Sequence, residues 1–254
     1  MVKVTIKDIK ERYLASKEKE KRFKWTYYVR RPVSYYVAWP FLKLGVSATS
    51  VTILWLFIAV IGCAIIASGG YLNMIIGTAI LEFAVILDCV DGHIARLTRP
   101  THIGDVLDTW VSEILLVASI FSVGIGLSNS HDLFLDRVMP SAINNTTFIY
   151  LGFFGALAAL SSWTVRLHWR TITLKLSLTD MEFDLHNSKK TLIVDNLFHY
   201  SGAVTMLLTV SAILYILDVT LIVVSITYGF YLFTVAYGIL RKARLMDSRY
   251  LGRT

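Results

Sequence analysis

The chain has 254 residues, of which 55% are hydrophobic and 17% are charged, and its formal net charge is +7. Soluble domains contain about 45–50% apolar residues, so the composition argues against an ordinary soluble protein and favours one that lies in a membrane. Twelve of the 25 Lys and Arg residues lie in the first 43 positions, ahead of the first long apolar run. This bias indicates contact with anionic lipid headgroups rather than with nucleic acid.

Residues 1–45 are predicted to be a basic N-terminal segment that includes an interfacial amphipathic helix. Residues 3–24 are highly charged but carry apolar residues at helical spacing, namely Ile6, Ile9 and Tyr13. This pattern predicts a helix that is solvated or lies on a surface, with a partner-binding role as the alternative. Between residues 25 and 39, six Trp and Tyr residues are mixed with arginines, as is typical of the lipid headgroup layer. Pro32 can begin a helix there, and we expect that helix to lie in the membrane plane and to end near Gly45.

Residues 46–242 contain six apolar runs, each close to the length of about 20 residues that crosses a bilayer as a helix. We place the spans at 47–68, 72–97, 103–127, 147–172, 193–217 and 220–241. The predicted outer loops hold one Lys or Arg, Arg137, and the inner segments hold the others. The positive-inside rule therefore places both termini in the cytoplasm. The predicted fold is an all-α integral membrane domain with six transmembrane helices, followed by a basic cytoplasmic tail at residues 243–254.

Five acidic residues cluster between the second and third spans: Asp88, Asp91, Asp105, Asp108 and Glu113. An acid at a membrane boundary is costly, so such residues indicate a function. Asp88 and Asp91 are three apart and share a helix face, and Asp108 lies near the start of the next helix. Carboxylates from two facing helix ends form an oxygen-rich pocket that suits a hard divalent cation.

Small residues accompany these acids. Gly92 and Ala95 continue the face of the first two aspartates with almost no side chain, which leaves room for a ligand to approach the backbone. Pro100 interrupts the helical pattern, and Gly104 loosens the start of the next helix. Tight helix packing in a membrane also favours small residues, and both interpretations can hold at once.

The residues of this stretch form one spaced pattern, Asp88-x-x-Asp91-Gly92-x-x-Ala95-Arg96, followed by Gly104-x-x-x-Asp108. The pattern resembles the signature of the CDP-alcohol phosphotransferases, a family of integral membrane enzymes that make phospholipids. The resemblance implies that Asp88, Asp91 and Asp108 bind a divalent cation, Mg²⁺ or Mn²⁺, and through it the diphosphate of a CDP-linked donor. It also implies that Gly92 and Ala95 make space for the cytidine nucleotide. The alternative is a structural cluster in which the acids form salt bridges with neighbouring arginines.

The family pattern normally ends in a fourth Asp, usually assigned as general base and second metal ligand, and here that position is Ser112. Ser112 shares a helix stripe with Asp108 and so points at the site, but a hydroxyl is a poor base at neutral pH. Asp105, on nearly the same stripe, and His93 and His102 are neighbouring groups. Either the reaction proceeds without the usual base, or a neighbour or the acceptor's own phosphate takes the proton, or catalysis is lost.

Four further residues are candidates for binding the substrates. Arg96 would contact phosphate or brace the carboxylates. Many relatives carry Pro-Asn-x-x-Thr at the start of the first span, where it contacts the nucleotide. Here the Thr is kept as Thr52, and the Pro and Asn are not. The alternative is that the Thr52 hydroxyl simply bonds the backbone of its own helix. Relatives whose acceptor is phosphorylated carry basic residues near Arg166 and Arg170, which makes these two residues candidates for an acceptor-phosphate site. Anchoring by the positive-inside rule explains these two arginines equally well.

Two other acids are assigned no catalytic role. Glu113 lies about 140° round the helix from Asp108 and so faces away from the metal site. Glu82 lies about 120° off the metal face of its helix. We expect Glu82 either to pair with another helix or to stay protonated.

The resemblance implies an enzyme that transfers a substituted phosphate group from a CDP-linked lipid donor to an alcohol, with a phosphorylated polyol among the candidate acceptors, and releases CMP. We expect a cytoplasmic active site, contact with membrane lipid, no nucleic-acid partner and, by analogy, a homodimer. One alternative is a catalytically silent family member that binds nucleotide or lipid for assembly or regulation. The other is an ion or proton transporter, which would spread its acids over several spans, whereas these acids, apart from Glu82, cluster at one end.

Overall fold

The computed structural model is helical throughout its regular structure, and no strand occurs in the residues that it describes, which are 5–16, 21, 23–98, 102–131, 133–138, 144–175 and 203–251. Its elements are the α-helices α1 (Ile6–Ser16), α2 (Arg31–Lys43), α3 (Ala48–Ala67), α4 (Tyr71–Leu97), α5 (His102–Ser128), α6 (Phe134–Val138), α7 (Asn145–Lys175), α9 (Val204–Ile213) and α10 (Leu217–Leu251), and the π-helical turn η2 (Thr26–Arg30). Five of the described helices are long and apolar enough to cross a membrane, namely α3, α4, α5, α7 and α10. The protein is therefore an all-α, multi-pass membrane protein.

The first four predicted spans agree with α3, α4, α5 and α7 to within three residues at each end. The sixth predicted span, 220–241, lies inside α10, which continues without a break across the predicted boundary between residues 242 and 243. The fifth predicted span covers 193–217, and its residues 193–202 lie outside the described part of the chain. Its described part contains α9, whose ten residues are too short to cross a bilayer. Six spans are therefore not established.

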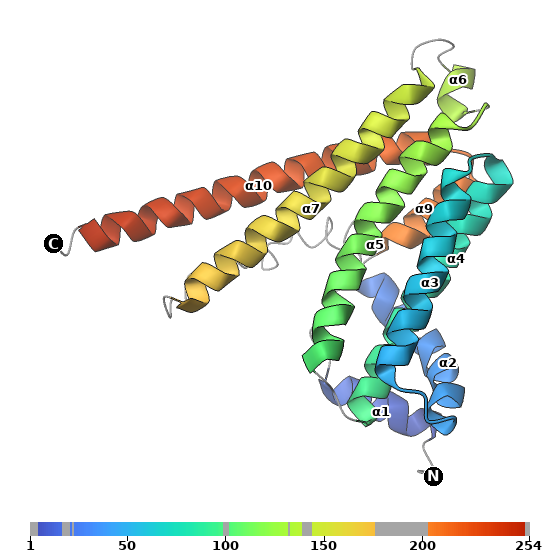
Figure 1. The fold of residues 1–254 in the computed structure, drawn as a ribbon, viewed down its shortest axis with the longest axis vertical. Helices are drawn as coiled ribbons and strands as arrows, with labels where there is room; N and C mark the ends of the chain where they lie inside the picture. The colour runs from blue at the N-terminus through green and yellow to red at the C-terminus, as the bar shows by residue number, and fades with distance from the viewer. Residues whose placement is uncertain are drawn as a thin grey trace.

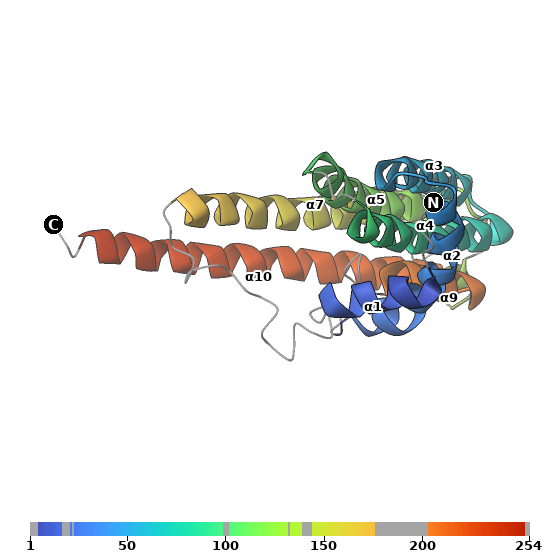
Figure 2. The ribbon, with the colours of Figure 1, turned by 90° about the horizontal axis from the view of Figure 1, so that it is seen from below.

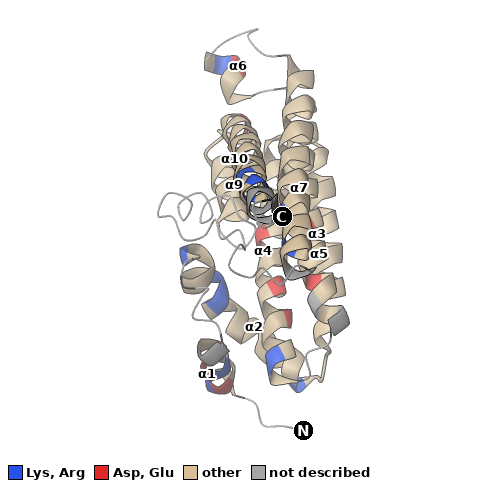
Figure 3. Ribbon diagram, turned by 90° about the vertical axis from the view of Figure 1, so that its left-hand side faces the viewer, with Lys and Arg blue, Asp and Glu red and all other residues tan. Residues whose placement is uncertain are grey.

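The long helices form a row in which each packs against the next. α3 packs on α4 and α5, α5 packs on α7, and α7 packs on α10. Figure 1 shows α3, α4 and α5 side by side, with α7 and α10 leading away from them toward the C-terminus. Figure 2 shows the same helices from below, with α1, α2 and α9 beside the bundle. Long stretches of the spans carry no Lys, Arg, Asp or Glu (Figure 3), as expected for helices that contact lipid.

Glycines allow the closest helix crossings. A Cβ atom built on Gly77 of α4 would lie 2.8 Å from the backbone oxygen of Gly62 on α3. A Cβ atom on Gly124 of α5 would lie 2.5 Å from the backbone oxygen of Phe148 and 2.9 Å from the Cα atom of Gly152, both on α7. Small residues let membrane helices approach closely, because packing and not water exclusion drives their association. These contacts fix α4 against α3 and α5 against α7.

The N-terminal helix α1 is held against the protein by one apolar face. Thr5 and Asp8 cap its start, because the Thr5 N–H donates to Asp8 Oδ2 over 2.7 Å and the Asp8 N–H donates to Thr5 Oγ1 over 3.3 Å. The bond from the Thr5 backbone holds the pKa of Asp8 below its ordinary value. Ile9 and Tyr13 are fully buried against α2 and α4. The expected surface helix thus has an exposed outer face and an inner face that belongs to the core of this chain.

The turn η2 carries an arginine that reaches the interior. The wholly buried Arg30 donates from Nε to Glu82 Oε1 and from Nη2 to Glu82 Oε2, both over 2.8 Å, and also donates from Nη2 to Thr205 Oγ1 on α9 over 2.7 Å. The indole N–H of Trp25 donates to Glu82 Oε1 over 2.9 Å. Of the two expectations for Glu82, pairing with another helical segment is the one observed. This bidentate pair fastens the N-terminal segment to α4 and α9.

The helix α2 continues from η2 and ends close to the predicted position. Its last residue is Lys43, and Gly45 follows with a φ of +69°, a conformation that favours glycine. Arg31, at the start of α2, donates from Nη1 to the backbone oxygen of Cys89 over 3.1 Å. The segment between η2 and α3 therefore packs along the C-terminal half of α4, where the acidic motif lies.

Candidate metal centre

Three aspartates come together where α3 begins, α4 ends and α5 begins, at the lower end of the bundle in Figure 1, which we call the motif end. Asp88 and Asp91 lie near the C-terminal end of α4, and Asp108 lies in the second turn of α5. One carboxylate oxygen from each residue lies within 4.8 Å of the others. The residues that the spacing predicted as metal ligands therefore converge in the folded chain.

The separation of these oxygens suits one shared divalent cation. Mg²⁺ binds oxygens at about 2.0–2.1 Å, so ligands on its opposite sides lie about 4.2 Å apart, and ligands on opposite sides of Ca²⁺ lie roughly 5 Å apart. Three carboxylates at this distance repel one another unless a positive charge lies between them. The ligands are all oxygens, which favours a hard cation over a soft one. Asp88, Asp91 and Asp108 can therefore hold such an ion together.

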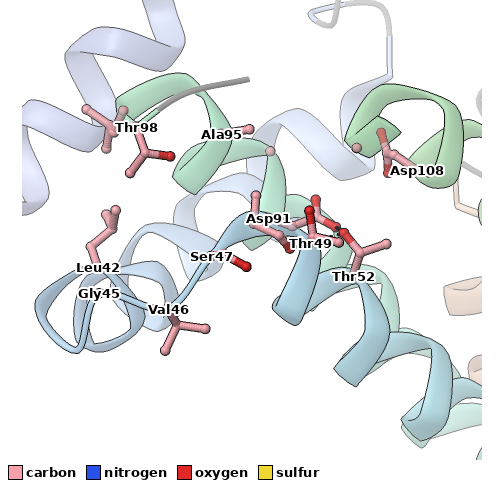
Figure 4. A pocket seen from close by; sticks show the side chains of 14 residues that line it. Leu42, Gly45, Val46, Ser47, Thr49, Thr52, Asp91, Ala95, Thr98 and Asp108 are labelled. Carbon is pink, nitrogen blue, oxygen red and sulfur yellow. Dashed lines mark hydrogen bonds between the residues drawn. The ribbon is translucent and has the colours of Figure 1, made fainter. Parts of the chain in front are cut away.

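Asp91 is fixed in place by the neighbouring helix α3. Its Oδ2 atom accepts a hydrogen bond from Thr52 Oγ1 over 2.7 Å and another from Trp55 Nε1 over 2.9 Å. Figure 4 shows Thr52 next to Asp91, with Asp108 across from them on α5. Thr52 was a candidate from the sequence, whereas Trp55 was missed. The signal was available, because Trp55 follows Thr52 by three residues and so lies on the same helix face.

Ser112 points at the aspartates, as its position four residues after Asp108 implied. Its Oγ atom donates to Asp88 Oδ1 over 3.4 Å, which is long for a hydrogen bond between oxygens. A hydroxyl therefore stands beside Asp88 where the family pattern has a carboxylate. Asp105 lies about one turn before Asp108 in α5, and its side chain, like that of His102, lies outside the described part of the structure.

A cavity of about 630 Å³ opens beside the aspartates (Figure 4). Asp91 and Asp108 form part of its wall, and the link between α2 and α3 forms another part. The small residues of the motif line it as well, namely Gly92, Ala95 and Gly104. A Cβ atom on Gly92 would have the guanidinium nitrogens of Arg96 as its nearest neighbours, at 3.4 Å. Gly92 is therefore not at a tight helix crossing, which favours ligand space as the reason for its small size.

Arg96 and His93 face the N-terminal segment. The guanidinium of Arg96 lies 5.6 Å from the ring centre of Tyr13 on α1, and its Nη2 lies 3.1 Å from Nδ1 of His93. His93 is almost fully buried, and its Nε2 lies 2.9 Å from Ser34 Oγ on α2. Arg96 also lines a second cavity of about 500 Å³ between α1 and the end of α4. These contacts place His93 in the packing of α1 and α2 rather than in the role of neighbouring base.

Arg166 and Arg170 line a separate cavity of about 240 Å³ together with Glu113, Trp163 and Leu167. Glu113 thus faces α7, in agreement with the expectation that it points away from the aspartates. Arg166 also donates from Nε to the backbone oxygen of Ser162 over 3.3 Å. The two arginines that were candidates for binding an acceptor phosphate therefore share their cavity with a carboxylate.

The sequence matches none of the protein-family models with which it was compared, and it matches no curated protein either. The function must therefore be inferred from the spaced motif and from the site. Within the described residues, the features that bear on it are the three converging aspartates, the cavity beside them and the donors on α3.

Proposed function

We propose that this protein is a metal-dependent CDP-alcohol phosphotransferase, which transfers a substituted phosphate group from a CDP-linked lipid to an alcohol and releases CMP. The observation that supports the proposal most strongly is the convergence of Asp88, Asp91 and Asp108 from two helices to within 4.8 Å. These residues stand at the spacings of the family signature. A structural ion-pair cluster has no need of Gly92 and Gly104 beside an open cavity, so the geometry favours a ligand site.

The roles of the residues follow from their places. Asp88, Asp91 and Asp108 would hold Mg²⁺ or Mn²⁺, and the cation, when bound, would offset the charge of the donor's diphosphate. The cavity beside them has about 630 Å³, within the roughly 300–1,000 Å³ of small-molecule sites. Gly92 and Ala95 would leave the space for the nucleotide.

The surroundings of the site fit a donor with a lipid tail. Val106 and Trp110 lie on α5 on either side of Asp108 along the chain, and both are exposed. Apolar side chains exposed at the end of a membrane helix offer a surface for acyl chains. The basic residues that precede α3 favour the cytoplasmic face for this end of the bundle by the positive-inside rule.

The acceptor site belongs to the same proposal. Arg166 and Arg170 would bind the phosphate of a phosphorylated acceptor, and Glu113 in the same cavity would bind a hydroxyl or a cationic group of that molecule. We also propose, by analogy with the family alone, that the enzyme is a homodimer.

The second candidate function is a catalytically silent relative that binds nucleotide or lipid. Its support is Ser112, whose hydroxyl stands 3.4 Å from Asp88 where the family has a carboxylate. A silent relative would be stabilised against heat by a CDP-linked lipid but would release no CMP.

The experiment that tests the proposal is a CMP-release assay on the purified protein with a panel of CDP-linked lipids and alcohols, in Mg²⁺ and in Mn²⁺. We expect turnover from the natural sequence and its loss in Asp91→Asn. The control is Asp136→Asn, which changes an acid on α6, a helix that packs on α10 and lies outside the motif. Unchanged turnover in Asp91→Asn would show that the site is wrong. Heat stabilisation without CMP release would favour the silent relative.

A further inference from the structure

Trp55 is a fully buried residue of α3 that bonds a motif aspartate. Its side chain has no solvent exposure, and its indole N–H donates to Asp91 Oδ2 over 2.9 Å. A buried indole N–H requires an acceptor, because leaving it without one costs about 1–3 kcal/mol. The acceptor here is a carboxylate that we assign to the metal centre.

The other donor to Asp91 has a competing acceptor. Thr52 Oγ1 lies 2.7 Å from Asp91 Oδ2 and 3.1 Å from the backbone oxygen of Ala48. A hydroxyl has one hydrogen, so it cannot donate fully to both atoms at once. The indole nitrogen of Trp55 can only donate, and Asp91 is the acceptor that it reaches. Trp55 is therefore the constant donor of the two.

Both donors meet the same oxygen, and this fixes how the carboxylate is turned. With Oδ2 directed at α3, rotation about the bond between Cβ and the carboxyl carbon would break two hydrogen bonds. The oxygen Oδ1 is then the one left for a cation shared with Asp88 and Asp108. Ligands held in this way by outer partners bind metal more tightly, and loss of such a partner typically costs about 10–100-fold in metal affinity.

We propose that Trp55 is a positioning residue for the metal centre, whose indole N–H holds the Asp91 carboxylate so that Oδ1 faces the cation. The inference rests on the proposed function in one respect, since it needs a cation at the three aspartates. It does not depend on the identity of the donor or the acceptor, nor on turnover.

The test is a Mn²⁺ titration of the full chain in detergent without substrate, in which electron paramagnetic resonance measures free Mn²⁺. We expect Trp55→Phe to weaken Mn²⁺ binding by about tenfold, because the aromatic bulk stays while the N–H is lost. The matched control is Trp169→Phe, a buried tryptophan of α7 that packs against Val235 and Ile239 of α10. We expect the control to leave the Mn²⁺ affinity unchanged.

A second comparison separates positioning from simple packing. In the Asp91→Asn background, Trp55→Phe should cause no further loss of Mn²⁺ affinity, because Trp55 acts through Asp91 and the two effects are then not additive. An equal tenfold loss in both backgrounds would overturn the proposal, since it would mean that Trp55 acts through the fold.

If Trp55→Phe does not fold, Thr52→Val and Thr52→Ser give the answer. We expect Thr52→Val to weaken Mn²⁺ binding by less than about threefold and Thr52→Ser to leave it unchanged. A tenfold loss in Thr52→Val would make Thr52 the principal donor to Asp91 and would overturn the proposal.

The outcomes also distinguish this inference from the proposed function. If the natural sequence binds no Mn²⁺, the proposed metal centre fails and the inference fails with it. If the natural sequence binds Mn²⁺ and Trp55→Phe binds it equally well, the inference alone is overturned.

Discussion

The hydroxyl of Ser112 on α5 stands 3.4 Å from Oδ1 of Asp88 on α4, so a side chain that is a poor base occupies the position next to the proposed metal ligands. A properly placed general base contributes roughly 10²–10⁴-fold to a reaction. We therefore expect Ser112→Asp to raise CMP release by at least about tenfold at neutral pH. The control is Ser112→Asn, whose side chain has nearly the shape of Asp without its charge, and it should not raise CMP release. If Ser112→Asp is no faster than the natural sequence, the missing carboxylate does not limit turnover.

The buried pair of Arg30 and Glu82 should contribute strongly to stability. Removing one partner of a buried ion pair typically costs about 3–5 kcal/mol, because the other charge stays buried without compensation. We expect Glu82→Gln to lower the melting temperature by several degrees in a fluorescence thermal-shift measurement. Glu11→Gln breaks the exposed pair with Lys7, at 3.7 Å, and should leave the melting temperature within error, since such surface pairs contribute about 0–1 kcal/mol. Equal effects of the two substitutions would contradict a stabilising role for the Arg30–Glu82 pair.

The crossing of α5 and α7 should tolerate no side chain at Gly124. A Cβ atom there would lie 2.5 Å from the backbone oxygen of Phe148, and overpacking of this kind costs typically about 1–3 kcal/mol. We expect Gly124→Ala to lower the melting temperature. Gly229→Ala on α10 is the matched control, because no atom beyond its own stretch of helix lies within 4 Å of its Cβ position. It should raise stability slightly, by up to about 1 kcal/mol, since alanine favours a helix more than glycine does. A Gly124→Ala variant as stable as the natural sequence would show that the two helices are not in close contact.

Gly92 should matter for substrate binding and not for stability. Its Cβ position adjoins the cavity, with the flexible Arg96 as the nearest group. We expect Gly92→Leu to raise the KM for the CDP-linked donor by about tenfold, which corresponds to about 1.4 kcal/mol, with an unchanged melting temperature. If Gly92→Leu lowered the melting temperature and left KM unchanged, Gly92 would serve packing instead.

Local patterns in the sequence predict the long helices and the convergence of the aspartates. Apolar runs of about 20 residues define spans. Helix periodicity places Asp88 and Asp91 on one face, and the interruption between the two helices allows the second helix to bring Asp108 back to them. The fifth predicted span stays a prediction, because its residues 193–202 lie outside the described part of the chain. The described helix there covers ten residues, Val204–Ile213.

The long-range partners could not be predicted in the same way. Trp55 and Asp91, like Arg30 and Glu82, lie on different helices, and no pattern within either helix shows which partner a buried polar group will meet. The position of α1 was missed for a related reason, since the spacing of Ile9 and Tyr13 predicts an apolar face but does not say whether lipid or protein covers it. The contacts of Trp55 with Asp91 and of Arg30 with Glu82 therefore come from the structure and not from the sequence.

A Mn²⁺ titration of three variants, Asp88→Asn, Asp91→Asn and Asp108→Asn, decides whether these carboxylates bind one cation together. If they do, each substitution weakens the same Mn²⁺ site by at least about tenfold, and Asp136→Asn leaves it unchanged. An unaltered Mn²⁺ affinity in any of the three variants would contradict a shared cation.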